Sequence, residues 1–144
     1  MKTTSSILLL SLSFCSCGPS KLGREQARIK TIVQSAYSSK DSQAFLDTFY
    51  WEGISDIEKQ KTVRVVRRGI ERGDRVIKIF FDSTDANTEF VDGGITYRAN
   101  LPVVGAIQVV KYSESNPGHT ATTSYSMGQK DGKLFIVGGA NPVK

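Results

Sequence analysis

The chain has 144 residues, of which 39% are hydrophobic and 23% charged, and 19 Lys and Arg against 14 Asp and Glu give a net charge of +5. This length and mixture fit one globular domain and exclude a disordered chain or a collagen-like fibre. The one apolar run, residues 7–14, is short and no sequence period recurs. A multi-pass membrane protein and a repeat array are therefore excluded as well.

The first residues are typical of an export signal. A single cation, Lys2, precedes the apolar run at 7–14, which is much shorter than the roughly 20 residues of a membrane-spanning helix. Both cysteines of the chain, Cys15 and Cys17, follow directly. We therefore expect an exported protein, whose partners do not include nucleic acid.

The residues around Cys17 resemble the end of a bacterial lipoprotein signal, in which a small residue precedes the Cys that is acylated. Cys17 fits better than Cys15, because Ser16 is small and Phe14 is bulky. The resemblance implies a signal peptide at 1–16, a lipidated tether at 17–23 and a membrane partner reached through the lipid. Gly18 then favours the outer membrane, if the cell has one. The alternative is ordinary cleavage near Ser20, which would release a periplasmic or extracellular domain.

Three helices are predicted after the tether, at about 24–38, 44–50 and 55–72. The first shows apolar residues at helical spacing, and the third begins with a capping box formed by Ser55 and Glu58. The stripe of the first helix consists of Ile29, Ile32, Val33, Ala36 and Tyr37. Gly53 and Gly73 follow the second and third helices.

From Arg75 onward the apolar period changes to two, which indicates strands. In the first strand, 75–82, we expect Ile77, Ile79 and Phe81 to share the buried face. Further strand segments are predicted at 89–91, 95–99, 103–112, 120–127 and 134–137. The turn Asp92-Gly93-Gly94 suits a tight hairpin.

This order predicts a single α+β domain over 24–144, with three N-terminal helices packed on one face of a four- to five-stranded antiparallel meander sheet. The order also resembles the nuclear-transport-factor-like and cystatin-like folds, in which a curved sheet wraps the helices. Residues 97–105 are similar to a segment of small exported bacterial domains of unassigned function. These resemblances imply a fold that often encloses a pocket, and no particular chemistry.

Catalytic patterns are lacking in the sequence. The single histidine, His119, lies in a predicted turn, and there is no G-x-S-x-G nucleophile motif or phosphate-binding loop. The carboxylates follow no metal-binding spacing, so neither a metal nor a cofactor is expected. We therefore favour a membrane-anchored envelope lipoprotein with a non-enzymatic binding or structural role.

A small-ligand pocket, with or without enzymatic activity, is the first alternative. Aromatic residues with a polar end could line such a pocket between sheet and helices. The candidates are Tyr37, Tyr50, Trp51, Tyr97 and Tyr125. The competing interpretation is that these side chains belong mainly to the hydrophobic core.

Electrostatic docking through the third helix is the second alternative. Residues 59–75 hold seven cations and two anions, which equals the net charge of the whole chain. At about 100° per residue, one line of the helix surface carries Lys61, Arg64, Arg68 and Arg72. This face could bind an anionic envelope polymer, a lipid surface or an acidic protein, or it could simply be solvated.

Overall fold

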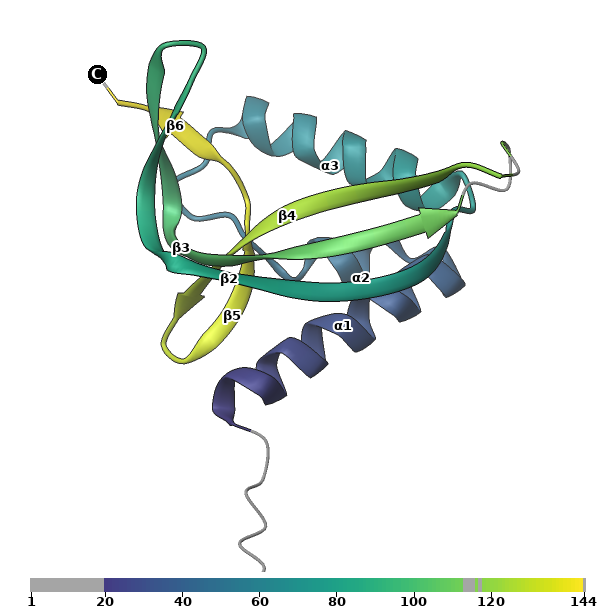
Figure 1. Cartoon of the computed structure of the whole chain (residues 1–144). Helices are drawn as coiled ribbons and strands as arrows, with labels where there is room; N and C mark the ends of the chain where they lie inside the picture. The colour runs from purple at the N-terminus through teal and green to yellow at the C-terminus, as the bar shows by residue number, and fades with distance from the viewer. Residues whose placement is uncertain (1–19, 113–115, 117, 144) are drawn as a thin grey trace, which may run out of the picture.

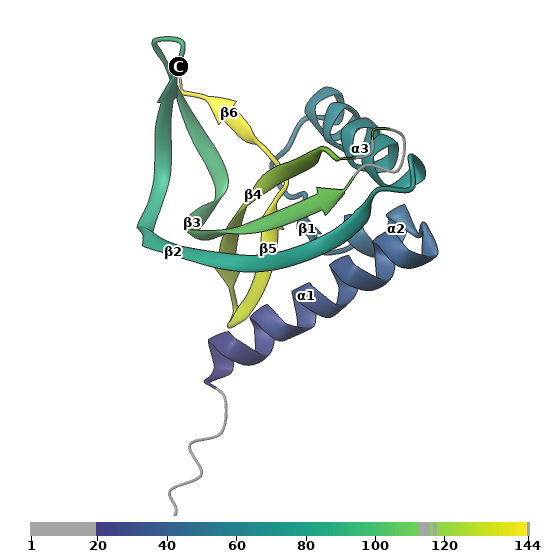
Figure 2. The same cartoon turned by 45° about the vertical axis from the view of Figure 1, so that its right-hand side comes forward.

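The computed structural model describes residues 20–112, 116 and 118–143. In chain order these residues form α1 (Lys21–Ser39), α2 (Ser42–Leu46), β1 (Phe49–Tyr50), α3 (Asp56–Glu71), β2 (Arg75–Asp92), β3 (Ile95–Tyr112), β4 (Thr120–Lys130), β5 (Lys133–Val137) and β6 (Ala140–Pro142). Figures 1 and 2 show all three helices on one side of a strongly curved sheet. No helix in this part of the chain has the length and hydrophobicity needed to cross a membrane.

Side-chain caps fix the helix starts. The Ser20 side chain accepts a hydrogen bond from the Gly23 amide at 3.1 Å, so α1 begins three residues before the predicted Arg24. The Ser55 side chain accepts from the Glu58 amide at 3.3 Å, and α3 follows as its capping signal predicts. Helix α1 ends at Lys40, which adopts the left-handed conformation with φ 57°.

The predicted meander of four or five antiparallel strands is wrong. The sheet has six strands in the described residues, in the order β1-β5-β4-β3-β2, and β6 pairs with β3. It is mixed, because β1 runs parallel to β5. Strand β1 has only two residues and lies at the end of a helical pattern, so period-two analysis does not detect it. The predicted second helix is correspondingly shorter and ends at Leu46.

Strands β2 and β3 also differ from the prediction, because each continues for 18 residues where two shorter strands were expected. Their pairing slips between Ser83 and Asn87 and again between Asn87 and Glu89, which bends the hairpin. We call its distal part, residues 87–98, the arm. Figure 2 shows the arm rising away from the rest of the sheet. Gly105 permits the bend, since a Cβ there would lie 2.2 Å from the Asp82 carbonyl oxygen.

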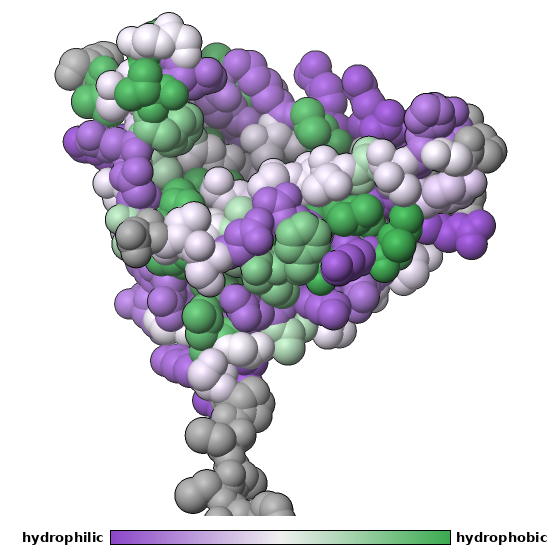
Figure 3. All heavy atoms as spheres, in the orientation of Figure 1, coloured by the Kyte–Doolittle hydropathy of each residue, from purple (hydrophilic) through white to green (hydrophobic). Residues whose placement is uncertain are grey.

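A bulge near the start of β2 makes the predicted buried face of this strand wrong at Ile77. The pairing shifts between Val76 and Lys78, which turns Ile77 outward and leaves it 57% exposed. Ile79 is buried and Phe81 is half-buried, as predicted. Figure 3 shows the outer face of the sheet, where hydrophobic and hydrophilic side chains are interspersed.

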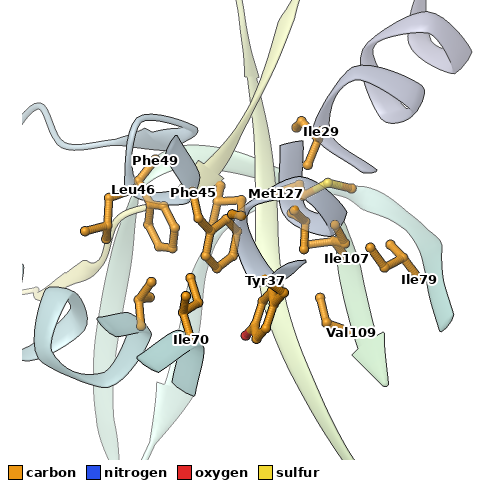
Figure 4. Close-up of a cluster of buried hydrophobic side chains, with 14 of the residues drawn as sticks. Ile29, Tyr37, Phe45, Leu46, Phe49, Ile70, Ile79, Ile107, Val109 and Met127 are labelled. Carbon is orange, nitrogen blue, oxygen red and sulfur yellow. The ribbon is translucent and has the colours of Figure 1, made fainter. Parts of the chain in front are cut away.

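The hydrophobic core fills the concave side of the sheet. Helix α1 contributes four residues of the predicted stripe, Ile29, Val33, Ala36 and Tyr37, which are buried, while Ile32 is half-buried. Phe45 from α2 lies fully buried at the centre, and Val66 and Ile70 come from α3. Figure 4 shows these side chains meeting Ile107 and Val109 of β3 and Met127 of β4. The core therefore joins all three helices to the same face of the sheet.

Candidate functional site

A groove of about 590 Å³ opens between α3 and the bent sheet. We call it the α3 groove. It is lined by Thr62 of α3, the inner side of the arm, β4 and the link between β5 and β6. The groove exists because β5 separates from β4 beyond the pair of Ile136 with Met127. The chain then crosses to the arm, where β6 pairs with β3. Figure 3 shows the surface hollowed between the arm and α3.

The floor of the α3 groove is aromatic. Phe49 and Tyr125 line it, with their ring centroids 6.1 Å apart in an edge-to-face arrangement. Behind them, the ring of Phe45 lies 5.3 Å from each of these two rings. Trp51 stacks on Phe49 at 5.1 Å. Such interlocked rings form a rigid apolar surface.

The Tyr125 hydroxyl does not provide a base for catalysis. It lies beside the Tyr37 hydroxyl in the core. Burial raises the pKa of Tyr125 and also that of Tyr37, in each case as the main cause. Both phenols are therefore protonated at physiological pH.

The rim of the α3 groove is polar and almost uncharged. Its hydroxyl and amide side chains are Thr62, Thr84, Asn87, Thr88, Ser124 and Ser126. Among the described side chains of the lining, Glu89 is the one charged residue, and its Oε1 atom accepts a 2.6 Å bond from Arg98 Nη2. The groove thus combines apolar contact with neutral hydrogen-bonding groups, and suits an uncharged polar ligand.

The five predicted pocket residues are not brought together, and Tyr125 alone of them lines the α3 groove. Tyr37 lies in the core. Trp51 packs on Phe49 with Lys59 Nζ 5.4 Å from its ring centroid, and Tyr97 stacks on Phe90 in the arm. Tyr50 lies at a separate hollow of about 620 Å³, where its hydroxyl contacts Glu52 and Lys130.

Lys111 is a buried charge that the sequence analysis did not single out. Its side chain is 9% exposed, with Nζ 3.8 Å from Asp74 Oδ2 and 5.6 Å from the centroid of the Tyr37 ring. Burial lowers the pKa of Lys111 despite the opposing effect of Asp74. A Cβ at Gly69 would lie 3.7 Å from Lys111 Nζ, which is an ordinary van der Waals contact. The pair joins the turn after α3 to β3, outside the α3 groove.

The predicted basic residues lie on the solvent side of α3. Lys61, Arg64, Arg68 and Arg72 are exposed, opposite the buried Val66 and Ile70. Lys61 pairs with Glu58 at 2.6 Å, and Arg72 Nε donates to the Arg68 carbonyl at 3.2 Å. Arg67, which the helical projection did not include, lines a shallow hollow of about 440 Å³ together with Arg64 and Arg68. We call Arg64, Arg67 and Arg68 the arginine cluster.

The cysteines and the histidine were the remaining candidate residues. Cys15 and Cys17 lie outside the described residues. His119 is exposed, and its backbone amide donates to the Asn116 carbonyl at 3.2 Å. The described part of the chain holds no group of three or more His, Cys, Asp or Glu side chains that could bind a metal ion.

Comparison of the chain with protein-family models, curated proteins and solved structures finds no match.

Proposed function

We propose that this chain is an exported, lipid-anchored envelope protein whose folded domain binds an uncharged ligand in the α3 groove. The observation that carries the proposal is the groove itself, with its rigid floor of Phe49 and Tyr125 and its hydroxyl rim. Binding sites in proteins are typically concave and mostly apolar, with a few polar groups that orient the ligand.

We propose binding rather than catalysis because of the state of the ionisable groups at the groove. The Glu89 carboxylate is engaged by Arg98, and burial raises the pKa of the Tyr125 phenol. An acid and base pair for catalysis needs groups whose pKa values lie near the working pH. A nuclear-transport-factor-like or cystatin-like relationship remains a part of this proposal, since such folds enclose pockets.

The anchor is proposed from the N-terminal signal and from the position of α1. Three residues separate Cys17 from Lys21, the first residue of α1, and they can span at most about 14 Å. Figures 1 and 2 place α3 and the arm at the end of the molecule opposite the start of α1. A lipid on Cys17 would therefore hold the domain with the α3 groove directed away from the membrane.

Metabolic labelling tests the anchor. A bacterial host expressing the full chain is supplied with an alkyne-tagged fatty acid, and the purified protein is examined for label. We expect label on the wild-type chain and on Cys15→Ala, and none on Cys17→Ala. An unlabelled wild-type chain would contradict the lipid anchor, and label lost only in Cys15→Ala would move the anchor to that residue.

Chemical-shift mapping tests the α3 groove. The isotope-labelled domain is titrated with a set of small neutral polyols and aromatic amides. We expect shift changes to concentrate at residues of the groove and to vanish in Thr62→Trp, which fills it from α3. Thr31→Trp on the exposed side of α1 is the matched control. Shifts scattered over the surface, or unchanged in Thr62→Trp, would contradict the proposal.

A second candidate function is docking of the arginine cluster to an anionic envelope polymer or protein. The cluster favours it because Arg64, Arg67 and Arg68 are exposed, and among the described residues no carboxylate forms an ion pair with them. Its position at the end opposite the start of α1 favours a target other than the anchoring membrane.

Heparin chromatography tests this candidate, with heparin as a model polyanion. Replacing the three arginines by Gln should lower the salt concentration at which the domain elutes, because fewer counterions are released on binding. The control replaces three exposed cations elsewhere, Lys30, Lys40 and Lys133, by Gln. Equal effects of the two triple variants would show that only net charge matters.

A further inference from the structure

Strand β4 has a long edge without a partner strand. Strand β4 pairs with β3 from Thr120 to Gly128, but with β5 only from Met127 to Lys130. Residues 120–126 therefore have a neighbouring strand on one side only. In the described part of the chain, the backbone groups of these seven residues that face the other side make no backbone hydrogen bond.

Other edges of the same sheet are protected. At β5, the Leu134 amide donates to Glu25 Oε2 at 3.1 Å, and the Leu134 carbonyl accepts from Arg28 Nη2 at 2.8 Å. Strand β6 has three residues and includes Pro142. The outer edge of β2 begins with a bulge and carries Lys78. Short strands, proline, bulges and lysine are the usual devices that stop an edge from pairing.

The free edge of β4 has none of these devices. Residues 120–126 read Thr-Ala-Thr-Thr-Ser-Tyr-Ser, with no charged residue and no proline. Threonine and tyrosine are residues that favour extended structure. A strand of this kind, exposed over seven residues, is a template for pairing with another extended chain.

The α3 groove lies beside the Ser124–Ser126 part of this edge. The α3 groove runs between Ser124–Ser126 of β4 and Thr62 of α3, and a paired strand lies about 4.8 Å from its neighbour. Figures 1 and 2 show α3 along the same side of the molecule. An edge strand of a second folded copy would have to bring its own helices past α3, whereas a single extended peptide would not.

The lining specifies the side chains of such a peptide. Tyr125 pairs with Ile107 and faces the core side, so a peptide residue beside Tyr125 would contact Phe49 and the apolar floor. The residues beside Ser124 and Ser126 would face the polar rim. Because Glu89 is already paired with Arg98, the lining favours no charge on the peptide.

We propose that the free edge of β4 binds an extended, uncharged peptide of alternating apolar and polar residues as an added strand. This inference rests on the proposed function, since the α3 groove is the site, and it names the class of ligand. The free edge supplies backbone hydrogen bonds, and the aromatic floor selects the apolar side chains.

The test uses a synthetic heptapeptide of alternating threonine and valine, with blocked ends, and amide hydrogen exchange on the domain. A strand pairs through one of its edges, where the amides of every second residue are presented. Two further peptides carry N-methyl groups, one on the odd residues and the other on the even residues. Pairing requires that one of these two still binds and that the other loses at least about tenfold in affinity.

We expect the plain peptide to slow exchange at alternate amides within residues 120–126. The proposal is overturned if these amides stay unprotected at millimolar peptide, or if both methylated peptides bind equally. If the peptide changes chemical shifts in the α3 groove without protecting these amides, strand pairing is ruled out and groove binding is retained. If sedimentation shows a dimer and these amides are already protected without peptide, the edge belongs to a second copy and the peptide proposal is overturned.

Discussion

The two ends of the helical layer differ in how they meet the sheet. Helix α1 lies against it with Ile29 and Val33 fully buried, and its side chains also cap β5. Helix α3 buries Val66 and Ile70, but the α3 groove separates its N-terminal half from β4. The comparison indicates that the α1 end maintains the fold, while the α3 end is free to bind.

The amino-acid sequence of the two helices accounts for this difference. Helix α1 carries an apolar stripe over two turns, whereas α3 devotes much of its surface to cations. Two of its apolar residues, Ile57 and Val65, are 68% and 66% exposed. A narrow apolar stripe can bury only a limited area against the sheet, so α3 leaves space beside β4.

The largest expected effect is in the hydrophobic core that supports both ends. Phe45→Ala removes a fully buried ring that contacts Phe49 and Tyr125, and it should lower the free energy of unfolding by about 3–5 kcal/mol. Chemical denaturation measures this loss. The matched variant is Phe90→Ala in the arm, where the ring is 48% exposed and we expect less than about 1 kcal/mol. Similar losses for both would remove the contrast between the two regions.

The bend that creates the groove is the next target. A Cβ at Gly105 would lie 2.2 Å from the Asp82 carbonyl oxygen, which belongs to the backbone and cannot rotate away. Gly105→Ala should therefore cost about 1–3 kcal/mol and shift the NMR signals of the arm. Gly69→Ala in α3, where an added Cβ would meet no atom closer than 3.7 Å, is the matched control. Unchanged arm signals in Gly105→Ala would contradict the role given to Gly105.

Local patterns predicted the first and third helices. The periodic residues Ile29, Val33 and Ala36 are buried, and the Ser55 cap begins α3, because both signals act within a few residues of the chain. The sheet was harder to predict because its pairings join distant residues. Phe49 pairs with Ile136, and nothing near Phe49 in the sequence indicates this partner.

The residues of the candidate site were likewise predictable only where a local pattern marks them. Tyr125 was predicted, but Thr62 and Ser126 carry no local signal, since the groove arises where β4 and β5 separate. The buried Lys111 did have a signal. It continues the period-two series of Ile107 and Val109 on the core face of β3, so the pattern already indicated a charge inside the domain.

The contact between α1 and β5 gives a smaller, pH-dependent effect. The hydrogen bond from Arg28 is the main cause that lowers the pKa of Glu25, and the Leu134 amide adds to it. Because the folded-state pKa lies below the ordinary 4.5, this stabilisation is present at neutral pH and is lost as the pH falls from about 4.5 through the folded-state pKa.

Glu25→Gln should cost about 1 kcal/mol at pH 7, since solvent screens an exposed ion pair. It should also flatten the dependence of unfolding free energy on pH below 4.5. Urea denaturation at several pH values measures both effects. Glu71→Gln, an exposed carboxylate on α3, is the control. An equal flattening in the control would assign the pH effect to net charge instead of to the α1 contact with β5.

The smallest effect on stability is expected at the groove, and it sharpens the comparison most. Ser124→Ala and Ser126→Ala change exposed side chains at the rim, so unfolding should shift by no more than about 0.5 kcal/mol. Their backbone groups remain, so strand pairing with an added peptide should also persist. By contrast, a ligand held through the rim hydroxyls should bind more weakly to both variants. Denaturation together with peptide and polyol titrations therefore separates a backbone-paired ligand from one recognised by side chains, and a large loss of stability would place these serines in the fold.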